Sequence, residues 1–103
     1  MKNNTKIAVI GSGTMGNGIA HVFAQANFNT LLVDINKNQL IKAMEVIEKN
    51  LERQIKKNII SIKDKDNILR NIKTSDNMDD CKEIDLVIEA IPEKYELKVS
   101  LFK

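Results

Sequence analysis

Three glycines at the spacing Gly11-x-Gly13-x-x-Gly16 are the residues of this chain best suited to hold a phosphate ligand. They follow a short apolar run, residues 6–10, and lead directly into a helical pattern. Gly11 permits a tight turn off a strand, Gly13 lets the backbone approach a diphosphate, and Gly16 lets the helix pack closely on the sheet. The start of the helix then offers unpaired N–H groups and the positive end of its dipole to phosphate oxygens.

A second apolar run, residues 30–33, ends in Asp34, about twenty residues beyond the glycines, as a dinucleotide-binding unit requires. The Asp34 carboxylate can accept hydrogen bonds from both hydroxyls of an adenosine ribose, and it would repel the 2′-phosphate of NADP. We therefore expect NAD to be bound in preference to NADP, although the nearby Lys37 weakens this expectation a little. The alternative is that Asp34 only caps the following helix.

Composition excludes several other classes of function. The 103 residues carry a formal net charge of +2, and basic and acidic residues are interspersed. Aromatic residues make up only 4%, so few side chains could stack on bases, and we expect no nucleic-acid partner. The chain has no apolar run of about eighteen residues, so we expect no membrane span. A single cysteine, Cys81, and a short polar N-terminus favour a cytoplasmic location.

The spacing of apolar residues predicts strands that alternate with helices. Asn27 is suited to end the first helix in a left-handed conformation, and Ser61 with Asp64 approximates a capping box. Pro92 should end the last strand. The predicted strands are 6–10, 30–33, 72–74 and 85–91; the predicted helices are about 14–26, 36–57, 61 or 63–70, and one beginning at 93, with at most one helical turn in 75–83.

This alternation predicts an α/β fold of the Rossmann type, a three-layer α/β/α arrangement with a parallel sheet in the strand order 3-2-1-4. We expect residues 1–103 to form one dinucleotide-binding domain. Its cofactor crevice should open between the first and fourth strands, where the strand order reverses. If the protein ended at residue 103, the apolar fourth strand would be a free edge, and we expect self-association or poor solubility through it.

Four features occur together in this sequence. The glycine motif and the apolar run that ends in an acid are shared by many nucleotide-binding dehydrogenases. A long lysine-rich second helix and an acidic, apolar fourth strand are more specific. Their residues are Gly11-Ser-Gly-Thr-Met-Gly-Asn-Gly18-Ile-Ala, Leu32-Val-Asp34, Ile47-Glu-Lys-Asn-Leu-Glu-Arg-Gln-Ile-Lys-Lys57, and Asp85-Leu-Val-Ile-Glu-Ala-Ile-Pro-Glu93 followed by Leu97-Lys98 and Leu101-Phe102. With this combination, residues 7–103 resemble the N-terminal part of the L-3-hydroxyacyl-CoA (3-hydroxybutyryl-CoA) dehydrogenases.

The resemblance implies sites for NAD and for an acyl-CoA substrate. Asp34 would hold the adenosine ribose, and Glu93 and Lys98 would contact the nicotinamide half. The nucleotide of CoA would contact Asn50 and Lys57, at positions where the family carries a serine and a lysine, so Asn50 departs from the family pattern. The residues implied to line the pyrophosphate are Gly11, Ser12, Gly13, Thr14, Met15 and Gly16.

The implied activity is the reversible, NAD-dependent oxidation of an L-3-hydroxyacyl-CoA to the 3-ketoacyl-CoA, as in fatty acid and butanoate metabolism. The family's catalytic histidine and glutamate would lie beyond residue 103, as would a C-terminal helical domain that binds substrate and joins the subunits of a homo-oligomer. We expect no catalytic residue and no metal site within the chain. Its one histidine, His21, falls inside the first helix, where we expect it to be partly solvated. Alone, the chain should bind NAD with little or no turnover.

Two other functions stay open from the sequence. One is the NAD-binding portion of a 6-phosphogluconate or 3-hydroxyisobutyrate type dehydrogenase, against which the lysine-bearing second helix and the segment Glu89-Ala-x-x-Glu93 argue. The other is a stand-alone nucleotide-binding module without a catalytic half.

Overall fold

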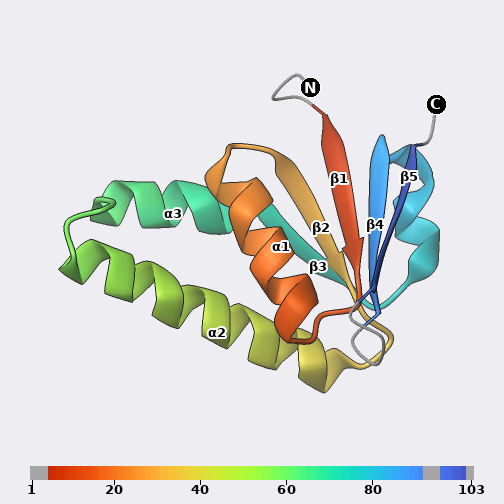
Figure 1. Ribbon diagram of the computed structural model, residues 1–103, viewed down its shortest axis with the longest axis horizontal. Coiled ribbons are helices and arrows are strands. Elements are labelled where there is room, and N and C mark those ends of the chain that lie inside the picture. The colour runs from red at the N-terminus through yellow and green to blue at the C-terminus, as the bar shows by residue number, and fades with distance from the viewer. Residues whose placement is uncertain (1–4, 92–95, 102–103) are drawn as a thin grey trace.

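The protein is described by a computed structural model, which covers residues 5–91 and 96–101. Its elements in chain order are β1 (Lys6–Ile10), α1 (Thr14–Gln25), β2 (Asn29–Val33), α2 (Lys37–Lys56), α3 (Ile62–Arg70), β3 (Ile72–Ser75), the 3-10 helix η1 (Met78–Glu83), β4 (Leu86–Ile91) and β5 (Glu96–Leu101). The strands form one sheet in the order β3-β2-β1-β4-β5, in which β1 to β4 run parallel. Helices α1, α2 and α3 lie on one face of the sheet and η1 lies on the other (Figure 1).

Two apolar clusters, one on each face, hold the helices to the sheet. Because successive side chains of a strand point to opposite faces, Ile7 and Val9 of β1 join the larger cluster under the three helices, whereas Ala8 joins the smaller one beside η1. In β4, Val87 packs with Ala8 in the smaller cluster. The two central strands are thus buried on both faces, which explains why they read as continuous apolar runs.

The elements predicted up to residue 91 are confirmed, as is the fold class with its strand order 3-2-1-4. Asn27 has φ +71°, the left-handed conformation expected after α1. The capping box at the start of α3 is present: Asp64 N donates to Ser61 Oγ at 3.1 Å, and Ser61 N donates to Asp64 Oδ2 at 2.9 Å. None of the helices in the described ranges is long and apolar enough to cross a membrane.

The helix predicted to begin at residue 93 is wrong, because residues 96–101 form the strand β5. This strand pairs antiparallel with β4, from Ile91 opposite Glu96 to Leu86 opposite Leu101. Its sequence alternates between polar and apolar residues with the period of a strand, and the edge of β4 presents backbone groups that need partners. The predicted free edge at β4 is therefore wrong too, and with it the reason to expect self-association there.

The carboxyl ends of the strands meet at one edge of the sheet and are joined by backbone hydrogen bonds. Gly11 N, just after β1, donates to Val33 O at the end of β2 over 2.8 Å. Asp34 N donates to Ser75 O, at the end of β3, over 3.1 Å. On the other side, Ile10 is in register with Glu89 of β4. This edge therefore brings the glycine-rich loop, Asp34 and the end of β4 together.

Substitution by alanine should have opposite effects on the free energy of unfolding at two glycines of α1, Gly16 and Gly18. A Cβ added at Gly16 would overlap the carbonyl oxygen of Gly11, whereas a Cβ added at Gly18 would meet no atom within 4 Å. Alanine in place of a helical glycine otherwise stabilises a helix by about 0.5–1 kcal/mol. We expect Gly18→Ala to raise the free energy of unfolding by about that amount, and Gly16→Ala to lower it by about 1–3 kcal/mol. Urea denaturation of both variants measures this, and a destabilised Gly18→Ala variant would contradict the packing described.

Candidate functional site

The glycine-rich loop turns tightly over the end of β4. Gly11 has φ +95°, a conformation that residues with a side chain rarely adopt. A Cβ at this position would also lie 2.7 Å from the carbonyl oxygen of Ala90, too close for a carbon atom. The loop, the start of α1 and the end of β4 can approach one another in this way because Gly11 and Gly16 have no side chain.

The first turn of α1 has N–H groups that no side chain caps. Gly13 is the N-cap residue, with φ −65° and ψ −169°, and it offers no side-chain acceptor. The other helices in the described residues begin differently, since Asn36, Ser61 and Asn77 each accept hydrogen bonds from backbone N–H groups of their own helix. An uncapped helix start behind a glycine-rich turn, with no acidic residue in its first turn, fits a diphosphate.

Asp34 is bonded to the glycine-rich loop. Its Oδ2 accepts hydrogen bonds from Ser12 N at 3.0 Å and from Ser12 Oγ at 2.8 Å. Its Oδ1 accepts from Asn36 N at 2.9 Å. A carboxylate offers about four lone-pair positions, so roughly one remains for an external donor. Asp34 is therefore placed to bind a ribose hydroxyl and, at the same time, to fix the loop.

These hydrogen bonds keep Asp34 ionised. Partial burial raises the pKa of its carboxyl group, but the N–H of Asn36 and the N–H and hydroxyl of Ser12 outweigh this effect and hold the pKa below its ordinary value. The carboxylate thus carries its charge at any pH near neutrality, which is the state that accepts hydroxyl donors and repels a second phosphate.

The remaining residues predicted for the pyrophosphate lie around this turn. Thr14 is exposed at the start of α1, and Met15 beside it is half-buried. Ser12 is only 2% exposed, and both its hydroxyl and its backbone N–H donate to Asp34, so Ser12 positions the loop and has no donor left for a diphosphate. The family resemblance implied that Ser12 lines the pyrophosphate. Nothing in the sequence indicated its bond to Asp34, because that contact depends on how close β1 and β2 lie.

The end of the site toward β4 is described only in part. Lys98 lies in β5, in register with Glu89 of β4, and its side chain lies outside the described part of the chain. Glu93 also lies outside the described residues. The sequence did not single out Ala90, whose carbonyl oxygen closes the space beside Gly11.

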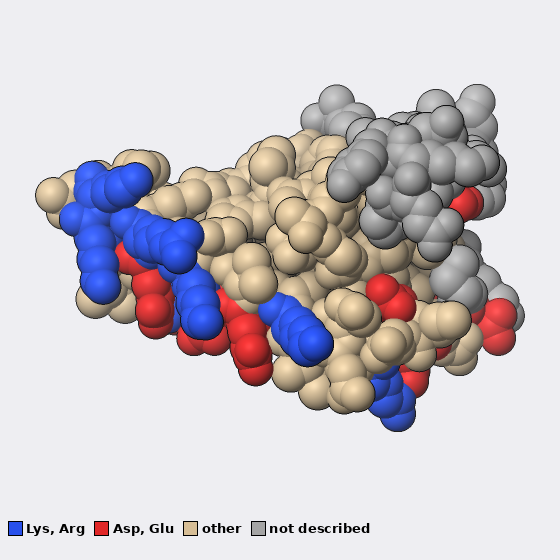
Figure 2. Space-filling view, turned by 60° about the horizontal axis from the view of Figure 1, so that its bottom comes forward, with Lys and Arg blue, Asp and Glu red and all other residues tan. Residues whose placement is uncertain are grey.

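Asn50 and Lys57 lie away from this edge, on the long hairpin of α2 and α3 (Figure 1). At about 1.5 Å per residue, Lys57 stands roughly 30 Å along α2 from its start. Asn50 is half-buried and accepts a hydrogen bond from the Arg53 guanidinium at 3.5 Å, whereas Lys57 is exposed. Figure 2 shows Lys and Arg side chains interleaved with acidic ones along this hairpin, most densely toward its far end. The structure thus separates these two positions from the glycine-rich loop.

His21 and one cavity take no part in this arrangement. The expectation that His21 is partly solvated is wrong: the side chain is 8% exposed and its Nε2 pairs with Gln25 Oε1, one helical turn away, at 2.9 Å. A hollow of about 460 Å³ lies between η1 and strands β2 and β3, beside Leu31, Thr74 and Asp80, and reaches the amino ends of the strands at Lys6 and Asn29; its lining in the described residues includes none of the residues predicted for the cofactor.

Comparison with known proteins gives one consistent family. Residues 6–103 match the family model described as the NAD binding domain of 3-hydroxyacyl-CoA dehydrogenase. A 3-hydroxybutyryl-CoA dehydrogenase of Bradyrhizobium diazoefficiens is 42% identical over 94% of this chain and 33% of its own length. A peroxisomal fatty acid beta-oxidation multifunctional protein of Oryza sativa is 39% identical over 94% of the chain and 13% of its own length.

A solved structure supports the same family. The crystal structure of (S)-3-hydroxybutyryl-CoA dehydrogenase from Ralstonia eutropha superposes with a TM-score of 0.84 and 39% sequence identity, over 89% of this chain and 32% of that one. These matches extend over nearly the whole of this chain. The chain spans about a third of the length of the dehydrogenases that it matches.

The bond between Ser12 and Asp34 predicts a pH-dependent stability. Because the pKa of Asp34 is lower in the folded than in the unfolded protein, its contribution is present above about pH 4 and is lost as the pH falls through the folded value. Ser12→Ala removes one donor, so the pKa of Asp34 should rise and the free energy of unfolding at pH 7 should fall by about 0.5–1.5 kcal/mol. The difference from the unmodified chain should shrink in acid. Carboxyl-carbon NMR titration and urea denaturation at several pH values measure both effects.

A matched control is Ser75→Ala, which removes a serine hydroxyl from another carboxylate, that of Asp80. It should leave the pKa of Asp34 unchanged. An Asp34 pKa that is the same in the Ser12→Ala variant and in the unmodified chain would contradict the role given to this hydroxyl.

Proposed function

The chain belongs to the 3-hydroxyacyl-CoA dehydrogenase family, as its NAD-binding domain, and from this premise we propose that NAD binds at the carboxyl edge of the sheet. The diphosphate rests on the loop from Gly11 to Gly16, and the adenosine ribose donates to Asp34. The observation that carries this proposal is the uncapped start of α1, which lies behind the glycine turn and beside an ionised carboxylate. Donors for the phosphates and an acceptor for the sugar thus occur side by side.

The nicotinamide half is then assigned to the end of β4. The strand order reverses between β1 and β4, and a crevice at such a point receives the part of a dinucleotide beyond its diphosphate. We propose Glu93 and Lys98 as its contacts, on the family pattern. For the CoA nucleotide we propose Asn50 and Lys57. The position of these two residues on the hairpin suits a long substrate that meets the cofactor only at its reacting end.

We infer that the whole protein oxidises an L-3-hydroxyacyl-CoA to the 3-ketoacyl-CoA, in fatty acid or butanoate metabolism. NAD, when bound, accepts the hydride in this reaction. The residues of this chain bind and orient the cofactor, while the histidine and glutamate that handle the substrate proton would lie beyond residue 103. The family assignment argues against the 6-phosphogluconate type of dehydrogenase and against a stand-alone module.

Other expectations about the whole protein stay predictions. They are assembly into a homo-oligomer, the absence of nucleic-acid and membrane partners, and a cytoplasmic location. The last is weakened by relatives whose names place them in peroxisomes or glyoxysomes.

Isothermal titration with NAD and NADP tests the cofactor assignment. The unmodified chain should bind NAD more tightly than NADP, because the Asp34 carboxylate accepts from a ribose hydroxyl and repels a 2′-phosphate. Asp34→Ala should weaken NAD binding by about 10–100-fold, since a hydrogen bond to a charged group contributes about 1.5–3 kcal/mol. NADP binding should change much less. Equal or tighter binding of NADP by the unmodified chain would contradict the assignment.

Loss of folding must be separated from loss of the ribose contact. Asp34→Ala also removes the acceptor for Ser12, so its thermal midpoint has to be measured beside its affinity. Ser12→Ala serves as the matched variant, because it removes the hydrogen bond from the Ser12 hydroxyl to Asp34 and keeps the carboxylate. It should retain a preference for NAD that Asp34→Ala loses.

A further inference from the structure

Cofactor choice at this site depends on more than Asp34, and the inference that follows rests on the proposed binding of NAD. An enzyme that accepts NADP must offer its 2′-phosphate a cation or free N–H groups beside the ribose. Two such sources lie near Asp34 in the described residues. One is the ammonium group of Lys37, the first residue of α2, and the other is the set of N–H groups at the start of that helix.

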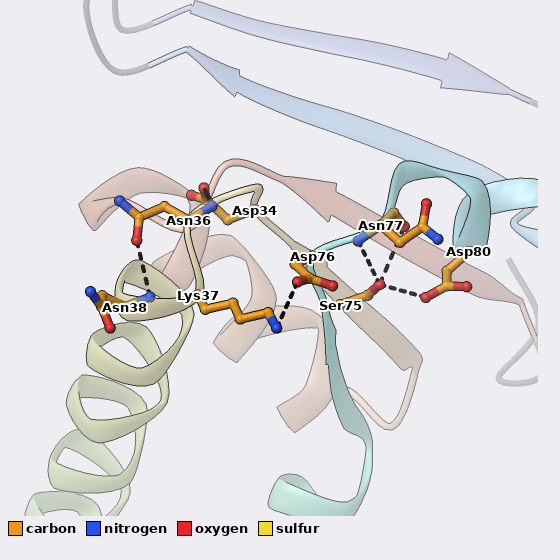
Figure 3. Close-up of polar contacts among 8 residues, drawn as sticks. All are labelled: Asp34, Asn36, Lys37, Asn38, Ser75, Asp76, Asn77 and Asp80. Carbon is orange, nitrogen blue, oxygen red and sulfur yellow. Dashed lines mark hydrogen bonds and ion pairs between the residues drawn. The ribbon is translucent and has the colours of Figure 1, made fainter.

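The ammonium group of Lys37 pairs with Asp76, an acidic residue just after the strand β3. Its Nζ lies 3.4 Å from Asp76 Oδ2, in the segment that follows β3. Figure 3 shows the Lys37 side chain extended toward Asp76. Asp34 is bonded to Ser12. The pair is open to solvent, with side-chain exposures of 79% for Lys37 and 42% for Asp76, so its strength is modest.

The segment that carries Asp76 is fixed by its neighbours. Ser75 Oγ accepts a hydrogen bond from Asn77 N at 3.0 Å and donates one to Asp80 (Figure 3). The turn between β3 and η1 is thus bonded on both sides of Asp76. Its carboxylate therefore stands at a defined place beside the start of α2, where a cation can meet it.

The N–H groups at the start of α2 are used by the protein itself. Asn36 Oδ1 accepts from Asn38 N at 3.0 Å and from Gln39 N at 3.3 Å. Asn36 N in turn donates to Asp34 Oδ1 at 2.9 Å. The contrast with α1 is direct, since α1 has no side-chain cap and α2 has one.

We propose that Asp76 is a specificity-determining residue, which disfavours NADP by holding the Lys37 ammonium away from the 2′-position of the bound ribose. It is a positioning residue, because it acts through Lys37 and touches no part of the cofactor. A 2′-phosphate would then meet the Asp34 carboxylate on one side, a capped helix start on another, and a cation already neutralised by Asp76. Removal of Asp76 releases that cation and also lowers the negative charge around the phosphate.

The test is the ratio of the dissociation constants for NAD and NADP in the Asp76→Asn variant, measured at low ionic strength. We expect this ratio to shift toward NADP by about two- to fivefold, the range of an exposed ion pair. Asp79→Asn is the matched control, because it removes the same charge three residues further on, at the start of η1, and Asp79 makes no ion pair with Lys37 among the described contacts. It should shift the ratio by less than Asp76→Asn does.

A second comparison isolates Lys37. Lys37→Gln alone should shift the ratio slightly toward NAD, since it leaves the Asp76 carboxylate unpaired, and in the double variant most of the gain from Asp76→Asn should disappear. Equal shifts in Asp76→Asn and Asp79→Asn, or a full gain that persists without Lys37, would overturn this inference and leave the proposed function intact. Failure of the unmodified chain to bind NAD in the same titration would overturn both. Equal thermal midpoints in these variants exclude a change of folding as the cause.

Discussion

The hydrogen bonds from Ser12 to Asp34 are the contact on which the whole site depends. They join the loop after β1 to the end of β2, and the glycine turn can then bring α1 against β4. Because both donors reach a single carboxylate oxygen, the loop is positioned by the same group that is assigned to the ribose. Shape and charge at this edge are therefore set together, and a substitution at Asp34 affects both.

Much of this arrangement could be predicted from the sequence, because it depends on local rules. The strict spacing of glycines, the apolar runs and the capping residues of α3 fixed the elements up to residue 91, since each of those signals reflects a steric or hydrogen-bonding need within a few residues. The tight turn at Gly11 and the position of Asp34 just after β2 followed in the same way.

The features that escaped prediction depend on how the elements pair and pack in the folded chain. Residues 96–101 alternate between polar and apolar residues, and pairing with the edge of β4 makes them a strand in place of the predicted helix. His21 is buried because of where α1 lies, and Gln25 satisfies its ring. The ion pair between Lys37 and Asp76 joins segments that only the parallel pairing of β2 and β3 brings together.

The central claim, that the loop from Gly11 to Gly16 and Asp34 form one cofactor-binding unit, is tested most directly by backbone amide NMR during a titration with NAD. The account predicts saturable shifts of the amides of this loop and of Asp34, with the far end of the α2–α3 hairpin unaffected. No saturable change in the loop at millimolar NAD, or shifts confined to the hairpin, would contradict it.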